Sequence, residues 1–149
     1  MKLDLIYTDS FPKHIIKKGI LRKKIRLLSK AISSKESVDF GEIEIVCLDA
    51  AEIKSYNKLH LGHDYETAII TFDLTEGKLI DGQLLISWET VMQNSKRFNT
   101  DFEKELLRVI VHGLLHLTGY DDRNEKQKRV IRKKENEYLK HQDYAGKSN

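Results

Sequence analysis

Four short stretches of the chain either alternate apolar and polar positions or are rich in β-branched residues, a pattern typical of strands. They cover residues 3–7, 42–48, 67–73 and 83–87. Turn signals lie between the last two stretches, at Glu76-Gly77 and Asp81-Gly82. The pattern therefore predicts four strands, with a turn directly before the last one.

Helical spacing of apolar residues separates these strands. Between residues 15 and 32, Ile16, Ile20, Leu27 and Leu28 have the spacing of an amphipathic helix. Residues 49–52 and 100–103 fit the capping box that begins many helices. We expect helices from 49 to about 59, from 88 to 97, from about 100 through His116, and from about 124 to 141. This mixture predicts an α+β fold, a small mixed β-sheet with helices packed on it.

The length indicates a single domain covering residues 1–149, and the composition is that of a soluble globular protein with a highly charged surface. Hydrophobic residues make up 40% of the chain and charged residues 33%. The single cysteine, Cys47, excludes an internal disulfide framework and lies in an apolar run, so we expect it in the core. The chain begins without the apolar segment of a signal peptide, and no apolar run approaches the roughly 20 residues of a membrane span. We therefore expect a cytoplasmic protein without a membrane partner.

Positive charge is concentrated in two parts of the chain, although the net charge is only +3. Such clusters are typical of proteins that bind a phosphate backbone, but a solvated helix face is the more common explanation for either cluster alone. The first cluster contains Lys13, Lys17, Lys18, Arg22, Lys23, Lys24, Arg26 and Lys30, and the second contains Lys126, Lys128, Arg129, Arg132, Lys133 and Lys134.

The most specific motif places two histidines, a glycine and an aspartate at fixed spacing. His112 and His116 are four residues apart, so on a helix they share one face and can bind one metal ion. Gly119 is suited to ending that helix, and Asp122 follows where the returning chain can supply a third ligand. Two buried core histidines are the alternative, but the added glycine and acid favour a metal site on this central helix and the turn after it. Three protein ligands leave a tetrahedral zinc ion one open position, as in catalytic sites.

The spacing matches that of metzincin peptidases, with two differences that change the chemistry. Gly113 stands where those enzymes have the glutamate that acts as general base, and Asp122 replaces the third histidine. A metal-dependent hydrolase of peptides or small esters is therefore disfavoured, and we expect a different substrate class.

The run from His112 to Asp122 resembles the motif of the YbeY-type rRNA maturation factors, H-G-x-L-H-L-x-G-Y-D-H, and differs from it only at Asp122. Weaker likeness extends upstream through Asn57, residues 62–72 and residues 82–87. The resemblance implies a metal-dependent endoribonuclease specific for single-stranded RNA. It would act in ribosomal RNA maturation and ribosome quality control, with ribosomal RNA and the ribosome as partners.

The resemblance also implies residue roles. His112 and His116 would be metal ligands, and Asp122 would stand in for the third histidine on Zn²⁺. A carboxylate lowers the charge of the site and shifts its preference slightly toward Mn²⁺ or Mg²⁺. The family usually has an arginine where this chain has Leu61; Lys58, His60 and His63 are the nearest candidates to replace it as RNA contacts. Two further departures are Ala68 and Gln83, where the family has aspartates.

Other residues near the motif have less certain roles. Arg108 lies one turn before His112, where it can contact RNA or form a surface ion pair. Asp121 can orient a ligand imidazole or belong only to the turn. Tyr120 is expected to pack the turn, and no general base is evident. Because the arginine is lost and the third ligand altered, a non-catalytic ribosome-assembly factor with a structural metal remains the alternative function.

Overall fold

The computed structural model describes residues 1–60 and 68–147, with the side chains of 57–60 and 141–147 left out. Four strands, β1 (Lys2–Tyr7), β2 (Phe40–Leu48), β3 (Ile69–Asp73) and β4 (Ile80–Ser87), form one sheet in the order β1-β2-β4-β3. β1, β2 and β4 are parallel, and β3 pairs with β4 in the antiparallel direction. The predicted α+β fold with a small mixed sheet is confirmed.

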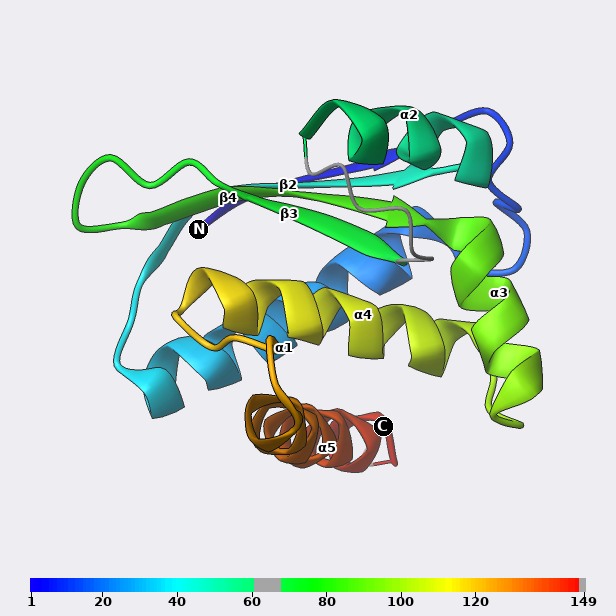
Figure 1. Ribbon diagram of the computed structural model, residues 1–149. Coiled ribbons are helices and arrows are strands. Elements are labelled where there is room, and N and C mark those ends of the chain that lie inside the picture. Colours follow the sequence, from blue (N-terminus) through cyan, green and yellow to red (C-terminus); the bar gives the residue numbers. More distant parts are fainter. Residues whose placement is uncertain (61–67, 148–149) are drawn as a thin grey trace.

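The described residues form five helices around this sheet (Figure 1). α2 (Ala50–His60) covers one face, whereas α1 (Lys18–Glu36) and α4 (Phe102–Leu117) lie against the other. α3 (Trp88–Arg97) follows β4 at one end, and α5 (Glu125–Lys147) packs on α1 and α4, on the side away from the sheet. α4 is therefore the central helix, between the sheet and α5. No helix in the described ranges combines the length and apolar character needed to span a bilayer.

The main core lies between the sheet and the helices α1 and α4. In β1 the alternation predicted from sequence holds, because Leu3 and Leu5 are buried and their neighbours are exposed. Cys47 is fully buried as expected. A smaller cluster, Leu48, Ile53, Ile70 and Leu85, fills the space under α2 on the opposite face. Both faces of the sheet are therefore covered.

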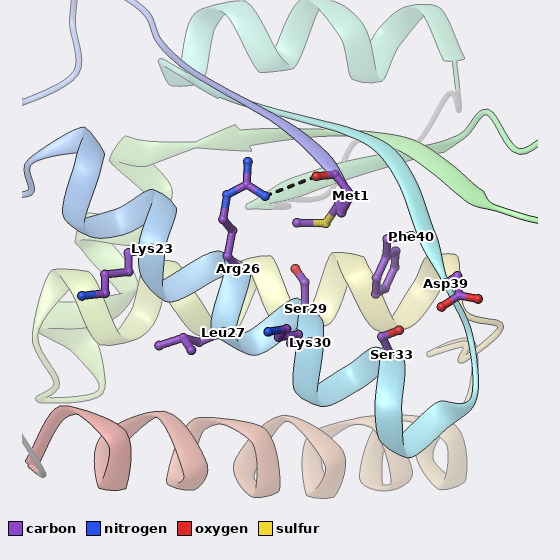
Figure 2. A pocket seen from close by; sticks show the side chains of 9 residues that line it. All are labelled: Met1, Lys23, Arg26, Leu27, Ser29, Lys30, Ser33, Asp39 and Phe40. Carbon is purple, nitrogen blue, oxygen red and sulfur yellow. Dashed lines mark hydrogen bonds between the residues drawn. The ribbon is translucent and has the colours of Figure 1, made fainter.

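α1 is amphipathic as predicted, but only part of the expected apolar set is buried: Leu28 is buried, as is Ile16 just before the helix, and the other two residues are not. Its buried apolar residues are Leu21, Ile25, Leu28 and Ile32. Ile20 and Leu27, which we expected to face the core, are 50% and 43% exposed. Beside Leu27 lies a cavity of about 440 Å³ between α1, the first residue and the start of β2 (Figure 2).

Two local predictions were wrong. Asp81 and Gly82 lie inside β4 and not in a turn, because both belong to the strand that pairs with β2 and β3. The N-cap of α4 is Asp101, one residue after the expected Thr100, and its carboxylate accepts a hydrogen bond from the Lys104 amide at 2.7 Å. Because Lys104 occupies the third helical position, the expected capping box does not form there. The box at 49–52 is confirmed, since the Glu52 amide donates to Asp49 at 2.9 Å and the Asp49 amide donates to Glu52 at 3.5 Å.

Candidate metal centre

α4 carries the two histidines on its last turns, and its close packing on the sheet fixes their position. Leu114 and Leu115 are fully buried, and Gly113 faces the sheet. A Cβ atom at Gly113 would lie 2.7 Å from Ile69 Cδ1 and 2.9 Å from Leu84 Cδ2. A larger side chain at this position would require the ends of the Ile69 and Leu84 side chains to move, so the close packing of α4 on the sheet favours glycine here.

The chain turns sharply after α4 and brings Asp122 back toward the histidines. Gly119 adopts a φ of +117°, a left-handed conformation that suits glycine. The amides of Gly119 and Tyr120 donate to the carbonyls of His116 and Leu115, both at 3.1 Å, and so satisfy the end of the helix. The helix end predicted at Gly119 is thus confirmed.

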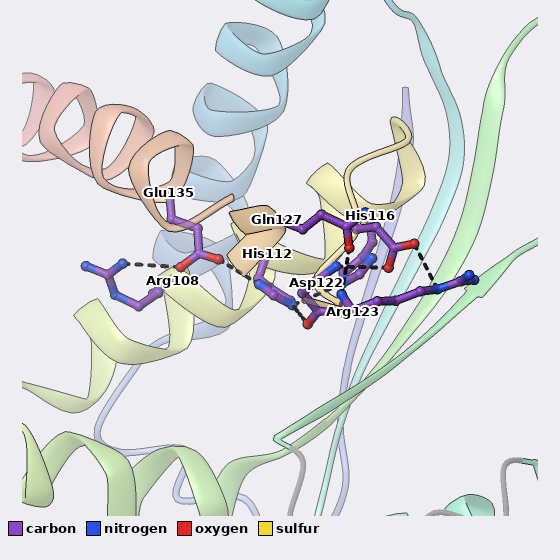
Figure 3. Close-up of polar contacts among 8 residues, drawn as sticks. Arg108, His112, His116, Asp122, Arg123, Gln127 and Glu135 are labelled. Atoms are coloured by element: carbon purple, nitrogen blue, oxygen red, sulfur yellow. Dashed lines mark hydrogen bonds and ion pairs between the residues drawn. The ribbon is translucent and has the colours of Figure 1, made fainter. Parts of the chain in front are cut away.

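His112, His116 and Asp122 come together at this turn (Figure 3). The two Nε2 atoms are 3.1 Å apart, and Asp122 carboxylate oxygens lie 3.3 Å from His112 Nε2 and 3.5 Å from His116 Nε2. Two ligand atoms that are each about 2.0–2.1 Å from one tetrahedral ion lie about 3.3–3.4 Å apart. The donor atoms therefore have the separations that a single ion requires, and the group could hold a metal ion.

Glu135 of α5 contacts His112 on the side of the ring opposite to the atom that faces His116 and Asp122. Its Oε2 lies 2.6 Å from His112 Nδ1, and its Oε1 accepts a hydrogen bond from Arg108 at 3.3 Å. A neutral His112 ring then donates its Nδ1 proton to Glu135, and its Nε2 lone pair faces His116 and Asp122. The Glu135 side chain is only 5% exposed, so this contact is shielded from water.

The groups around His112 change the pKa of its ring. Burial alone would lower the pKa of the ring. The hydrogen bond and negative charge of Glu135, together with the charge of Asp122, outweigh burial and raise the pKa above its ordinary value. A cation, either a proton or a metal ion, is therefore favoured at this position.

A second carboxylate, Glu36 at the end of α1, holds the two segments that carry Asp122 and Glu135. Tyr120 donates to Glu36 Oε1 at 2.9 Å, and Tyr138 donates to Glu36 Oε2 at 2.6 Å. Tyr120 precedes Asp122 by two residues, and Tyr138 follows Glu135 by three. Glu36 therefore ties the turn after α4 and the helix α5 to the same point on α1. The expectation that Tyr120 packs the turn is confirmed.

The remaining residues singled out from the sequence have different positions. Arg108 is ion-paired with Glu135, which is one of the two alternatives left open. Asp121 pairs with Arg123 at 3.0 Å and accepts a hydrogen bond from the Asp122 amide at 2.9 Å, and neither contact involves a histidine ring. The carboxylate that contacts Nδ1 of His112 belongs to Glu135. The side chains of Lys58 and His60 and the whole of Leu61 and His63 lie outside the described part of the chain.

Glu135 is the site residue that sequence reasoning missed. A signal was present, because Ile131, Tyr138 and Leu139 define the inward face of α5 and Glu135 lies on that face. A glutamate on an apolar helix face needs a partner, but the sequence alone did not show that His112 is the partner.

The mixed sheet and the His–His–Asp group define a small α+β protein with a candidate metal centre. The family described as Endoribonuclease YbeY matches residues 8–143. A protein named Endoribonuclease YbeY from Bacteroides fragilis is 42% identical over 110 residues, which cover 74% of this chain and 79% of that protein. One of the same name from Chloroherpeton thalassium is 38% identical over 83% of this chain and 88% of that protein.

The fold is also similar to the solution structure of TM1509 from Thermotoga maritima, with a TM-score of 0.65 and 28% identity. That match covers 99% of this chain and 93% of the other. The chain belongs to the YbeY endoribonuclease family, as the motif around His112 suggested.

Proposed function

We propose that this protein is a metal-dependent endoribonuclease that cleaves single-stranded RNA and acts in ribosomal RNA maturation and ribosome quality control in the cytoplasm. Family membership supports the nuclease activity and RNA as the substrate. The ribosomal role extends the resemblance of the His112–Asp122 motif to the rRNA maturation factors.

The observation that carries the metal dependence is the close approach of the donor atoms: the two histidine Nε2 atoms are 3.1 Å apart, Asp122 Oδ2 lies 3.3 Å from His112 Nε2, and Asp122 Oδ1 lies 3.5 Å from His116 Nε2. We infer that these residues hold one divalent ion, with Zn²⁺ as the first candidate because two imidazoles and a carboxylate are ordinary zinc ligands. When bound, such an ion would polarise a phosphoryl oxygen and lower the pKa of water.

The protein's own groups have two tasks in this proposal. Glu135 holds the His112 ring in the tautomer and orientation that direct Nε2 to the site, and Arg108 balances the charge of Glu135. The side chains of His112 and His116 are 23% and 24% exposed, and that of Asp122 is 41% exposed. The site is therefore open on the Asp122 side, where an RNA strand can approach.

The test is cleavage of an end-labelled single-stranded RNA by protein loaded with one equivalent of Zn²⁺ or Mn²⁺. We expect cleavage by the wild type and by His14→Ala, which removes an exposed histidine outside the site. Both His116→Ala and chelator-treated wild type should lose at least about 100-fold in rate, since removing even a supporting residue of a metal site costs 10–100-fold. A duplex of the same sequence should remain intact.

Two results would contradict this proposal. If the metal-loaded protein binds RNA or ribosomes but never cleaves, the non-catalytic assembly factor is the better description. If His116→Ala cleaves as fast as His14→Ala, the reaction does not depend on this site.

A further inference from the structure

A cavity of about 380 Å³ opens beside the candidate metal centre, bounded by α4, α5 and the start of β3. His112 and Asp122 line this cavity, so the cavity lies directly beside the proposed metal ligands. Lys128 and Arg132 contribute the α5 side of the same cavity. Two cations thus lie on the side of the candidate site that is open to solvent.

The positive charges of α5 divide between different faces of the helix. Lys128 and Arg132 are four residues apart and share a face with Glu135, the partner of His112. Arg129 and Lys133 are each one residue further along, are exposed, and are not among the described residues that line the cavity. Lys134 points to another neighbour, because it pairs with Glu36 at 3.8 Å.

Two of the acids that line this cavity lie deeper than the cations of α5. Glu105 and Glu135 are 7% and 4% exposed and form its floor, whereas Lys128 and Arg132 are exposed. Burial raises the pKa of Glu105, and the negative charge of Glu135 adds to that effect. A ligand that enters from solvent therefore meets Lys128, Arg132 and the half-exposed Asp122 before it reaches the two buried acids.

The two cations at the rim are available for a ligand. Within the described part of the chain, Arg132 has no hydrogen bond or close ion pair, although its charge acts on the buried Glu105 and opposes the rise in the pKa of that carboxyl; Arg108 is held by Glu135. Lys128 pairs with Glu125 at 3.6 Å, and both side chains of this pair are largely exposed. An exposed ion pair of this kind contributes little and is easily exchanged for another anion.

We propose that Lys128 and Arg132 form a phosphate subsite that holds a backbone phosphodiester of single-stranded RNA beside His112 and Asp122. This inference rests on the proposed function and names the residues that bind its substrate. The planar guanidinium of Arg132 can contact two phosphate oxygens, and the Lys128 ammonium supplies a point charge. Arg132 and Lys128 are positioning residues, because they hold the strand while the reaction takes place at the His–His–Asp group.

The experiment compares two double variants of equal charge on the same helix, Lys128→Gln/Arg132→Gln and Arg129→Gln/Lys133→Gln. Binding of a fluorescent single-stranded RNA is measured by anisotropy in chelator, so that no cleavage occurs, at several salt concentrations. Loss of one phosphate contact should reduce the slope of log affinity against log salt by about 0.7. We expect the Lys128/Arg132 variant to bind at least about tenfold more weakly at low salt and the control to change by less than about threefold. Zinc affinity of both variants should stay within about threefold of the wild type.

Several outcomes would overturn the subsite. If both double variants weaken binding equally while the wild type binds and cleaves RNA, the subsite is wrong and the proposed function stands. If polyglutamate displaces the RNA as well as unlabelled RNA does at equal charge, the ligand is not specifically a phosphodiester. If the wild type binds no RNA under any condition, the proposed function fails together with the subsite.

Discussion

The helices α1 and α5 are both rich in lysine and arginine, but the folded chain uses the two sets of charges differently. On α1, Arg22 and Arg26 donate to the carbonyls of Leu3 and Met1, and Lys24 pairs with Glu103. These cations connect the helix to β1 and to the start of α4. On α5, Lys128 and Arg132 instead line the cavity beside His112.

The difference shows that a basic cluster in a sequence does not by itself identify a binding surface. The α1 cavity is lined by Lys23, Arg26 and Lys30 and has the apolar residues Met1, Leu27 and Phe40 in its walls (Figure 2). None of the described residues that line it is a histidine. The α5 cavity places cations next to a group that could hold a metal. The α1 cations named above therefore have structural contacts, whereas we propose that Lys128 and Arg132 of α5 bind substrate.

The largest expected effect comes from removing a proposed ligand on the α5 side. Asp122→Ala should weaken zinc binding by more than about 100-fold, because the loss of a direct ligand should exceed the 10–100-fold cost of losing a supporting residue. Asp39→Ala, a matched change in the wall of the α1 cavity, should leave zinc affinity unchanged. Calorimetric titration of both variants measures this; equal losses in the two would remove the distinction between the cavities.

A smaller loss is expected when the support of His112 is weakened. Glu135→Gln keeps the shape of the side chain but removes its charge, and zinc affinity should fall by about 10–100-fold. Glu137→Gln, two residues further along α5, is the control and should bind zinc as the wild type does. Competition with a zinc-sensing dye gives both affinities, and an unchanged value for Glu135→Gln would show that His112 does not depend on α5.

Glu36 joins the two regions, so its removal should destabilise the fold in a pH-dependent manner. Burial by itself would raise the pKa of Glu36, but hydrogen bonds from Tyr138 and Tyr120 and the charge of Lys134 outweigh it and lower the pKa below 4.5. A carboxylate with a lowered pKa in the folded state stabilises the protein above its unfolded pKa, and this stabilisation is lost as the pH falls through the folded pKa.

Glu36→Gln should therefore lower the free energy of unfolding by about 1.5 kcal/mol at pH 7, the usual contribution of a hydrogen bond to a charged group. Urea unfolding of wild type and variant at pH 7 and at acidic pH measures the difference, which should shrink below pH 4.5. A difference that grows on acidification would contradict the assigned network.

The smallest effect concerns the arginines of α1. Arg22→Gln/Arg26→Gln removes two hydrogen bonds to backbone carbonyls and should cost about 1 kcal/mol of stability, with RNA affinity nearly unchanged. The control Arg129→Gln/Lys133→Gln lies on an exposed part of α5 and should stay within about 0.5 kcal/mol of the wild type. If the α1 variant loses RNA affinity as strongly as Lys128→Gln/Arg132→Gln, the contrast between the helices is wrong.

The sequence predicted those features that depend on neighbouring positions. The spacing of His112 and His116, the helix end at Gly119 and the alternation of Leu3 and Leu5 are local patterns, and all appear in the fold. The family resemblance came from the same local run and is confirmed.

Features that depend on distant partners were not predictable in this way. Glu135 lies 23 residues from His112, and only the packing of α5 on α4 brings them together. The exposed Ile20 and Leu27 fit the helical spacing, but the packing of α1 buries only part of the expected apolar set. Asp81 and Gly82 look like a turn until β4 pairs with both β2 and β3.

The central claim is that His112, His116 and Asp122 bind one metal ion. Anomalous diffraction at the zinc edge, on crystals grown with one equivalent of Zn²⁺, tests it most directly. We expect a single peak about 2.0–2.2 Å from both Nε2 atoms and from an Asp122 carboxylate oxygen. No peak at this position, or a zinc ion bound elsewhere while Asp122 points away from both rings, would contradict it.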